Sequence, residues 1–124
     1  MYIKPKNILV ISSSHYFKEA IADTMAGRGY NTQFVHDLDS AVVAVKIDSP
    51  DLILFEYGYD FRGDDEMLRF YTYGGSAIHG KRMLIFTDSN RPTYSILGKS
   101  VEILKTSAIY NREMLRARIS GIFY

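Results

Sequence analysis

Three segments of this chain are apolar at every position: Ile8–Ile11, Leu52–Phe55 and Met83–Phe86. Short runs of this kind are typical of strands buried on both faces, as in a parallel sheet that helices cover on each side. Their length and the turn residues beside them favour strands over buried helical segments. Two further apolar runs, Thr32–Val35 and Val101–Leu104, bring the expected number of strands to five.

The segments between these runs have the period of an α-helix. One stripe follows Ser13 and Ser14, either of which can supply an N-cap, and Gly27 and Gly29 then end the helix. A second helix is expected between a cap at Asp37 and a stop at Ser49-Pro50, and a third at the C-terminal end of the chain. The apolar positions of the three helices are Phe17, Ile21 and Met25; Leu38, Ala41, Val42 and Val45; and Leu115, Ile119, Ile122 and Phe123.

Two segments are harder to interpret. A weaker helix is expected from about Asp64 to Tyr73, closed by Gly74-Gly75-Ser76. Between Asn90 and Ser100, Pro92, Gly98 and scattered polar residues permit only a short or irregular helix.

Strands that alternate with helices indicate right-handed crossover units. The sequence therefore predicts a doubly wound, five-stranded parallel sheet in a three-layer α/β/α sandwich with a reduced fourth helix. A length of 124 residues suits one domain, residues 1–124, and is too short for two. In such folds ligands bind at the carboxyl ends of the strands.

Composition excludes several classes of function. Lys and Arg number 15 and Asp and Glu 14, so no general attraction to nucleic acid or to an anionic membrane is expected. The absence of cysteine excludes disulfides and thiol chemistry. His15, His36 and His79 lack metal-ligand spacing. No run approaches the ~18 apolar residues of a membrane span. Taken together, these features lead us to expect a cytoplasmic protein without a metal or cofactor.

The residues that follow the strands carry the functional information. Ser12-Ser13-Ser14 follows the first strand and Glu56 the third, while Thr87-Asp88 follows the fourth and Lys105-Thr106 the fifth. Together with the stretch Pro50-Asp-Leu-Ile-Leu-Phe55, this order resembles the receiver domain of two-component response regulators, a flavodoxin-like fold. The resemblance covers residues 7 to 122.

The resemblance implies a role for each strand-end position. Thr87 and Lys105 match the pair that contacts the phosphoryl group in the family. Glu56 stands where the family has its acceptor aspartate, and Ser12 and Ser13 stand where it has two acidic metal ligands. Glu102 replaces the aromatic residue that serves as a conformational switch.

These replacements affect the chemistry directly. Magnesium needs hard oxygen ligands and usually one or two protein carboxylates, so two serines and a glutamate make a poor site. Without the metal, only Lys105 opposes charge on a transferring phosphoryl group. We therefore expect a pseudo-receiver that is not an enzyme and acts in a signalling pathway through protein partners. Glu56 and Lys105 are expected to lie about 4 Å apart or to share a water, either as a functional pair or as a vestigial, solvated one.

Two other functions remain open at this point. Ser12-Ser13-Ser14 before a helix could bind a phosphate, as in a flavodoxin-like flavin-nucleotide binder, although no glycine between Ser12 and Ala26 eases close approach of the backbone. An active receiver that uses Glu56 is the third interpretation.

The sequence also bears on the surfaces that a partner could use. The resemblance favours the last two strands and their helices, where a homodimer could also form. Arg112, Arg116 and Arg118 of the last helix are expected to form a solvated face. Aromatic residues that could face either a partner or the core cluster after the third strand: Tyr57, Tyr59, Phe61, Phe70, Tyr71 and Tyr73.

Overall fold

The five strands form one parallel sheet in the order β2-β1-β3-β4-β5. The computed structural model describes residues 5–57, 70, 72, 73, 75, 78, 81–88 and 101–123. The order places β1, β3 and β4 inside the sheet, and all neighbouring strands are parallel, as the alternation of strands and helices predicts. The strands are β1 (Asn7–Ile11), β2 (Asn31–Val35), β3 (Leu52–Glu56), β4 (Arg82–Phe86) and β5 (Val101–Leu104).

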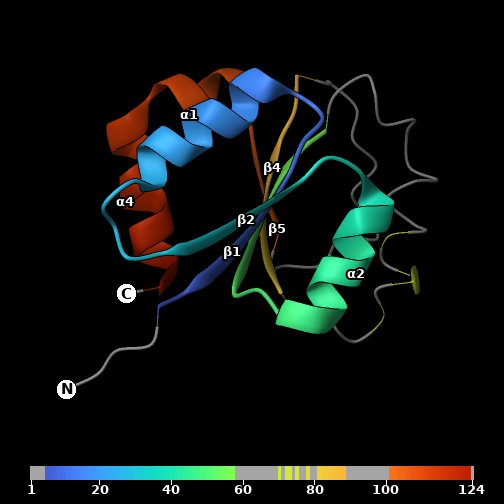
Figure 1. Cartoon of the computed structure of the whole chain (residues 1–124). Coiled ribbons are helices and arrows are strands. Elements are labelled where there is room, and N and C mark those ends of the chain that lie inside the picture. The colour runs from blue at the N-terminus through green and yellow to red at the C-terminus, as the bar shows by residue number, and fades with distance from the viewer. Residues whose placement is uncertain are drawn as a thin grey trace.

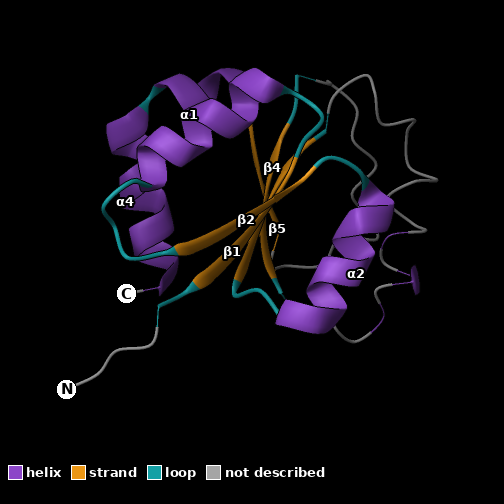
Figure 2. Ribbon diagram, in the orientation of Figure 1, coloured by secondary structure: helices purple, strands orange, loops and turns teal. Residues whose placement is uncertain are grey.

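Helices cover both faces of this sheet, as Figures 1 and 2 show. Helices α1 (His15–Met25) and α4 (Arg112–Phe123) pack on one face, and α2 (Leu38–Asp48) packs on the other. A 3-10 helix, η3 (Thr106–Tyr110), follows β5 directly and was not expected from the sequence. The doubly wound α/β/α architecture is confirmed.

The core consists of two apolar layers that the three central strands share. Each strand sends alternate side chains to opposite faces, so Leu9 packs toward α2 while Val10 packs toward α1. Every residue of the three all-apolar runs is buried. The edge strands β2 and β5 are largely exposed instead, which explains their weaker apolar pattern.

The ends of the helices are set by the residues that the sequence indicates. Ser14 Oγ accepts the Phe17 N–H at the start of α1, and Asp37 Oδ1 accepts the Ser40 N–H at the start of α2. Beyond α1 the chain turns through Gly27 and Gly29, both at positive φ, which glycine adopts without steric cost. Ser49 closes α2 in the left-handed conformation at φ 45°.

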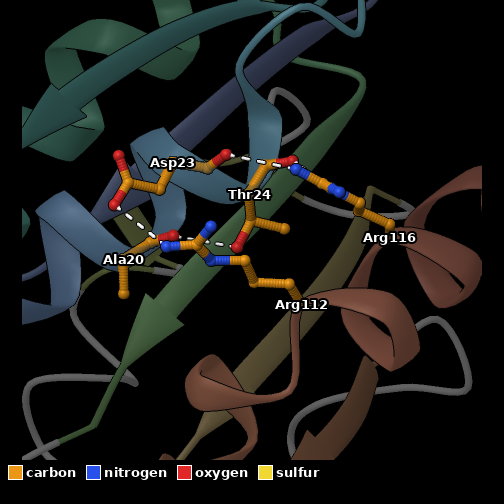
Figure 3. Close-up of polar contacts among 5 residues, drawn as sticks. All are labelled: Ala20, Asp23, Thr24, Arg112 and Arg116. Atoms are coloured by element: carbon orange, nitrogen blue, oxygen red, sulfur yellow. Dashed lines mark hydrogen bonds and ion pairs between the residues drawn. The ribbon is translucent and has the colours of Figure 1, made fainter.

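Two arginines of α4 bind the C-terminal end of α1 (Figure 3). Arg116 Nε donates to the Thr24 carbonyl oxygen at 3.0 Å, and Arg112 Nη2 lies 3.4 Å from Asp23 Oδ2. The last carbonyls of a helix have no partner within it and carry partial negative charge. The expected solvated face is wrong for Arg116, which is half-buried against α1, whereas Arg112 stays 58% exposed while it pairs with Asp23.

Several sequence-based expectations fall wholly or partly outside the described residues. The helix expected from Asp64 to Tyr73 is described only at residues 70, 72 and 73, which are helical. The reduced fourth helix between Asn90 and Ser100 lies outside them, as do Tyr59, Phe61, Tyr71 and His79. Within the described ranges, no helix combines the length and apolar character needed to cross a membrane.

Candidate functional site

The sheet brings the predicted strand-end residues to one edge. Ile11 pairs with Phe55, Glu56 with Phe86, and Phe86 with Leu104. Because all strands run in the same direction, the residues that end or follow them lie side by side at the carboxyl edge of the sheet: Ser12, Glu56, Thr87 and Lys105.

A short hydrogen bond joins the first and third strands at this edge. Ser12 Oγ donates to Glu56 Oε1 at 2.6 Å, and Ser12 Oγ itself accepts the Ser14 N–H at 2.9 Å. The Ser12 backbone is held as well, since its N–H donates to the Val35 carbonyl oxygen at 3.0 Å. Ser12 is fully buried and Glu56 is half-buried. The two residues that the receiver resemblance assigns to a metal-ligand position and to the acceptor position thus bind each other.

Lys105 does not join this pair. Its side chain is exposed, and the ion pairs found among the described residues do not include one between Lys105 and Glu56 within 4.0 Å. The direct contact expected at about 4 Å is wrong in this structure, and the arrangement with a shared water stays a prediction. The physical reason is that the buried Ser12 hydroxyl, already oriented by the Ser14 N–H, satisfies Glu56 locally.

The other two strand-end positions differ in exposure. Thr87 is buried, and its N–H donates to the Leu104 carbonyl oxygen at 2.9 Å, which continues the β4–β5 ladder. Ser13 is exposed at the start of α1. Asp88 Oδ1 accepts the Thr106 N–H at 3.3 Å and so links the ends of β4 and β5.

Glu102, which the receiver resemblance places at the aromatic switch position, forms an ion pair with Arg118 of α4. Both side chains are partly exposed. An exposed pair of this kind contributes about 0–1 kcal/mol. A charged side chain paired at the surface cannot alternate between buried and exposed positions as cheaply as an aromatic ring can.

The donor set at the carboxyl edge does not fit magnesium. Octahedral Mg²⁺ is usually held by one or two carboxylates among its oxygen ligands, whereas here Glu56 Oε1 accepts from Ser12 and Asp88 Oδ1 accepts from the Thr106 N–H. Within the part of the chain that the structure describes, no three His, Cys, Asp or Glu residues are grouped so that they could hold a metal ion.

A hollow of about 200 Å³ lies at the opposite edge of the sheet. Residues at the amino ends of β1 and β2 line it together with Ala44, Asp48 and Pro50. In a doubly wound sheet, ligands bind at the carboxyl ends, so this hollow is not the counterpart of a flavin or nucleotide site.

Comparison with known proteins rests on structure. No protein-family model matches the chain, and neither does any curated protein sequence. The receiver domain of NtrC4 from Aquifex aeolicus superposes with a TM-score of 0.69 at 15% identity, covering 95% of this chain and 96% of that one. The chain has the receiver fold.

Two further solved structures agree with this assignment. The pseudo-receiver domain of the CikA protein gives a TM-score of 0.67 at 13% identity, covering 96% of this chain and 98% of that one. A response regulator protein from Burkholderia multivorans gives 0.64 at 20% identity, with 94% and 95% covered. The receiver fold is thus shared over nearly the whole chain, whereas sequence identity is low.

Sequence reasoning named Ser14, Asp88 and Arg118 but did not predict their contacts: the Ser14 N–H orients the Ser12 hydroxyl, Asp88 accepts the Thr106 N–H, and Arg118 pairs with Glu102. Only Ser14 had a local signal, as a cap residue. Of the aromatic cluster, Phe70 is buried and Tyr57 packs on Phe55 with ring centroids 6.0 Å apart, so these two belong to the core rather than to an exposed surface.

Proposed function

We propose that this chain is a pseudo-receiver, a cytoplasmic signalling domain that binds protein partners and does not accept a phosphoryl group. The observation that carries the proposal is the 2.6 Å hydrogen bond from Ser12 to Glu56. It joins the two positions that the receiver reaction would need free, one for the metal and one for the nucleophile.

Electrostatics oppose phosphoryl transfer at this edge. Charge that develops on a transferring phosphoryl group must be offset by a metal ion or by positioned cations. Here the residues do not fit magnesium, and Lys105 is exposed and does not pair with Glu56. The Ser12 hydroxyl also occupies one oxygen of the carboxylate that would have to attack phosphorus.

The alternative as a phosphate or flavin-nucleotide binder is weakened by the same contact. Ser12 is buried, and its hydroxyl hydrogen is used by Glu56 and its oxygen by the Ser14 N–H. A phosphate at this edge would also meet the negative charge of Glu56. An absorption spectrum of the purified protein checks this alternative, since a bound flavin would colour it yellow.

Exposed apolar residues beside the last strand support a protein partner. Ile103 of β5 and Tyr110 of η3 are 42% and 76% exposed, and the Glu102–Arg118 pair lies on the same strand and the adjacent helix α4. Aromatic and aliphatic anchors with charges around them are common in protein interfaces.

The proposal is tested by incubating the protein with acetyl phosphate and magnesium and measuring its intact mass. A receiver domain with its aspartates in place serves as the positive control. We expect no phosphoryl adduct, and no magnesium binding by calorimetry at millimolar concentration. A hydroxylamine-labile adduct mapped to Glu56 would overturn the proposal.

A further inference from the structure

Helix α2 presents an apolar stripe to solvent on the face opposite to the one it buries. Ala41, Ala44 and Val45 of this helix pack into the core. Val43 is 56% exposed and Ile47 is 74% exposed, and residues four apart lie on the same face of a helix. Exposed β-branched residues in adjacent turns form a continuous patch that water covers at a cost in free energy.

Two opposite charges flank this stripe on the same face. Asp39 lies one turn before Val43 and Lys46 one turn after it, seven residues after Asp39, so the two charges share one side of the helix. Both side chains are exposed, and among the described residues neither has an ion-pair partner. From the N-terminal end of the helix, this face therefore presents an acidic, an apolar, a basic and an apolar side chain: Asp39, Val43, Lys46 and Ile47.

This arrangement is complementary to itself in one orientation. A two-fold axis near Val43 places a second α2 antiparallel to the first, so that Asp39 of each copy lies near Lys46 of the other. Closed two-fold interfaces use the same patch on both subunits, with contacts that occur twice. The antiparallel orientation also aligns the two helix dipoles favourably.

From these features we propose that a second copy of this chain docks on α2, through Asp39, Val43, Lys46 and Ile47. This goes beyond the proposed function and uses a face of the sheet different from that of α4. One helix face is smaller than the roughly 800 Å² per partner of a standard interface. The dimer is accordingly weak and depends on protein concentration.

Charge exchange tests both the surface and the orientation. Sedimentation of the wild-type protein from micromolar to millimolar concentration should show an average mass that rises toward that of a dimer. Asp39→Lys and Lys46→Asp each turn two attractions into repulsions and should weaken association about tenfold. The double variant D39K/K46D should restore it. An equimolar mixture of the two single variants should associate better than either alone.

Two controls separate this proposal from general effects of charge or folding. Glu113→Lys reverses an exposed acidic residue in the first turn of α4 and should leave association unchanged. Val43→Ser with Ile47→Ser should abolish association while the circular dichroism spectrum stays that of the folded protein. A monomer at every concentration, or a dimer that no α2 variant affects, would overturn the proposal. Failure of the double variant to restore association would also overturn it.

Discussion

The buried hydroxyl of Ser12 donates a hydrogen bond of 2.6 Å to Oε1 of Glu56 and joins the ends of β1 and β3. The two residues are 44 positions apart and meet because β1 and β3 are neighbours in the sheet. A hydrogen bond to an ionised acceptor is shorter and stronger than one between neutral groups. This contact therefore stabilises the carboxyl edge as well as occupying it.

Replacing Ser12 with alanine tests the energetic value of this contact. The change leaves the half-buried Glu56 carboxylate and the Ser14 N–H without this partner. We expect the free energy of unfolding to fall by about 1–3 kcal/mol, measured by urea denaturation. Ser120→Ala, at an exposed position of α4, is the matched control and should change it by less than about 0.5 kcal/mol.

A double-mutant cycle with Glu56→Ala identifies the source of the effect. If the hydrogen bond matters, the double variant S12A/E56A should be more stable than the sum of the two single changes predicts. Strict additivity would show that Ser12 contributes through the Ser14 N–H or through packing alone.

Lys105→Met tests whether the lysine contributes electrostatically to Glu56. The Lys105 side chain is exposed and makes no ion pair with Glu56 in the described part of the chain. We therefore expect a change of less than about 1 kcal/mol in the free energy of unfolding. A loss of about 3–5 kcal/mol, the cost of breaking a buried pair, would show that the two groups are coupled after all.

Much of the fold could be predicted because its signals are local. Every position of Leu52–Phe55 is apolar and every one is buried, and Asp37 caps α2 through an N–H only three residues away. The convergence of Ser12 and Glu56 at one edge follows from the rule that parallel strands end together. These inferences need only periodicity, capping and sheet topology.

The remaining contacts depend on how the chain packs at long range. The hydrogen bond from Arg116 to the Thr24 carbonyl spans 92 residues, and no local pattern indicates it. The short 3-10 helix η3, which begins at Thr106 directly after Lys105, also has no local signal in the sequence. Each polar side chain at the site has several groups within reach, and the spacing of residues in the sequence does not indicate which of these groups it will bind.

Arg116→Ala tests the connection between α4 and α1. The half-buried guanidinium donates to the Thr24 carbonyl oxygen at 3.0 Å and to that of Asp23 at 3.5 Å (Figure 3). We expect the free energy of unfolding to fall by about 1.5–3 kcal/mol, because a charged donor is lost to carbonyls that then lack a partner. Arg118→Ala, which removes only the exposed pair with Glu102, should cost less than about 1 kcal/mol. Equal losses for the two variants would contradict a specific role for Arg116 in closing α1.

The cap at the start of α2 should make the stability of the protein depend on pH. The hydrogen bond from the Ser40 N–H to the Asp37 carboxylate holds the pKa of Asp37 below its ordinary value, helped by the Ser40 side chain. A carboxyl group whose pKa is lower in the folded state stabilises the protein above its unfolded pKa of about 3.9. That contribution is lost as the pH falls through the folded pKa. Asp37→Ala should lower the free energy of unfolding by about 0.5–2 kcal/mol at neutral pH.

The difference between the wild-type protein and Asp37→Ala should then shrink as the pH falls from about 5 to 2. Thermal denaturation followed by circular dichroism over this range measures it. Asp37→Asn is the matched control, because asparagine also caps helices well but carries no charge. Its stability should stay close to that of the wild-type protein and should lack the part of the pH dependence that Asp37 contributes. If the difference between wild type and Asp37→Ala stayed constant across the range, the cap would act through its geometry alone and the lowered pKa would have no effect on stability.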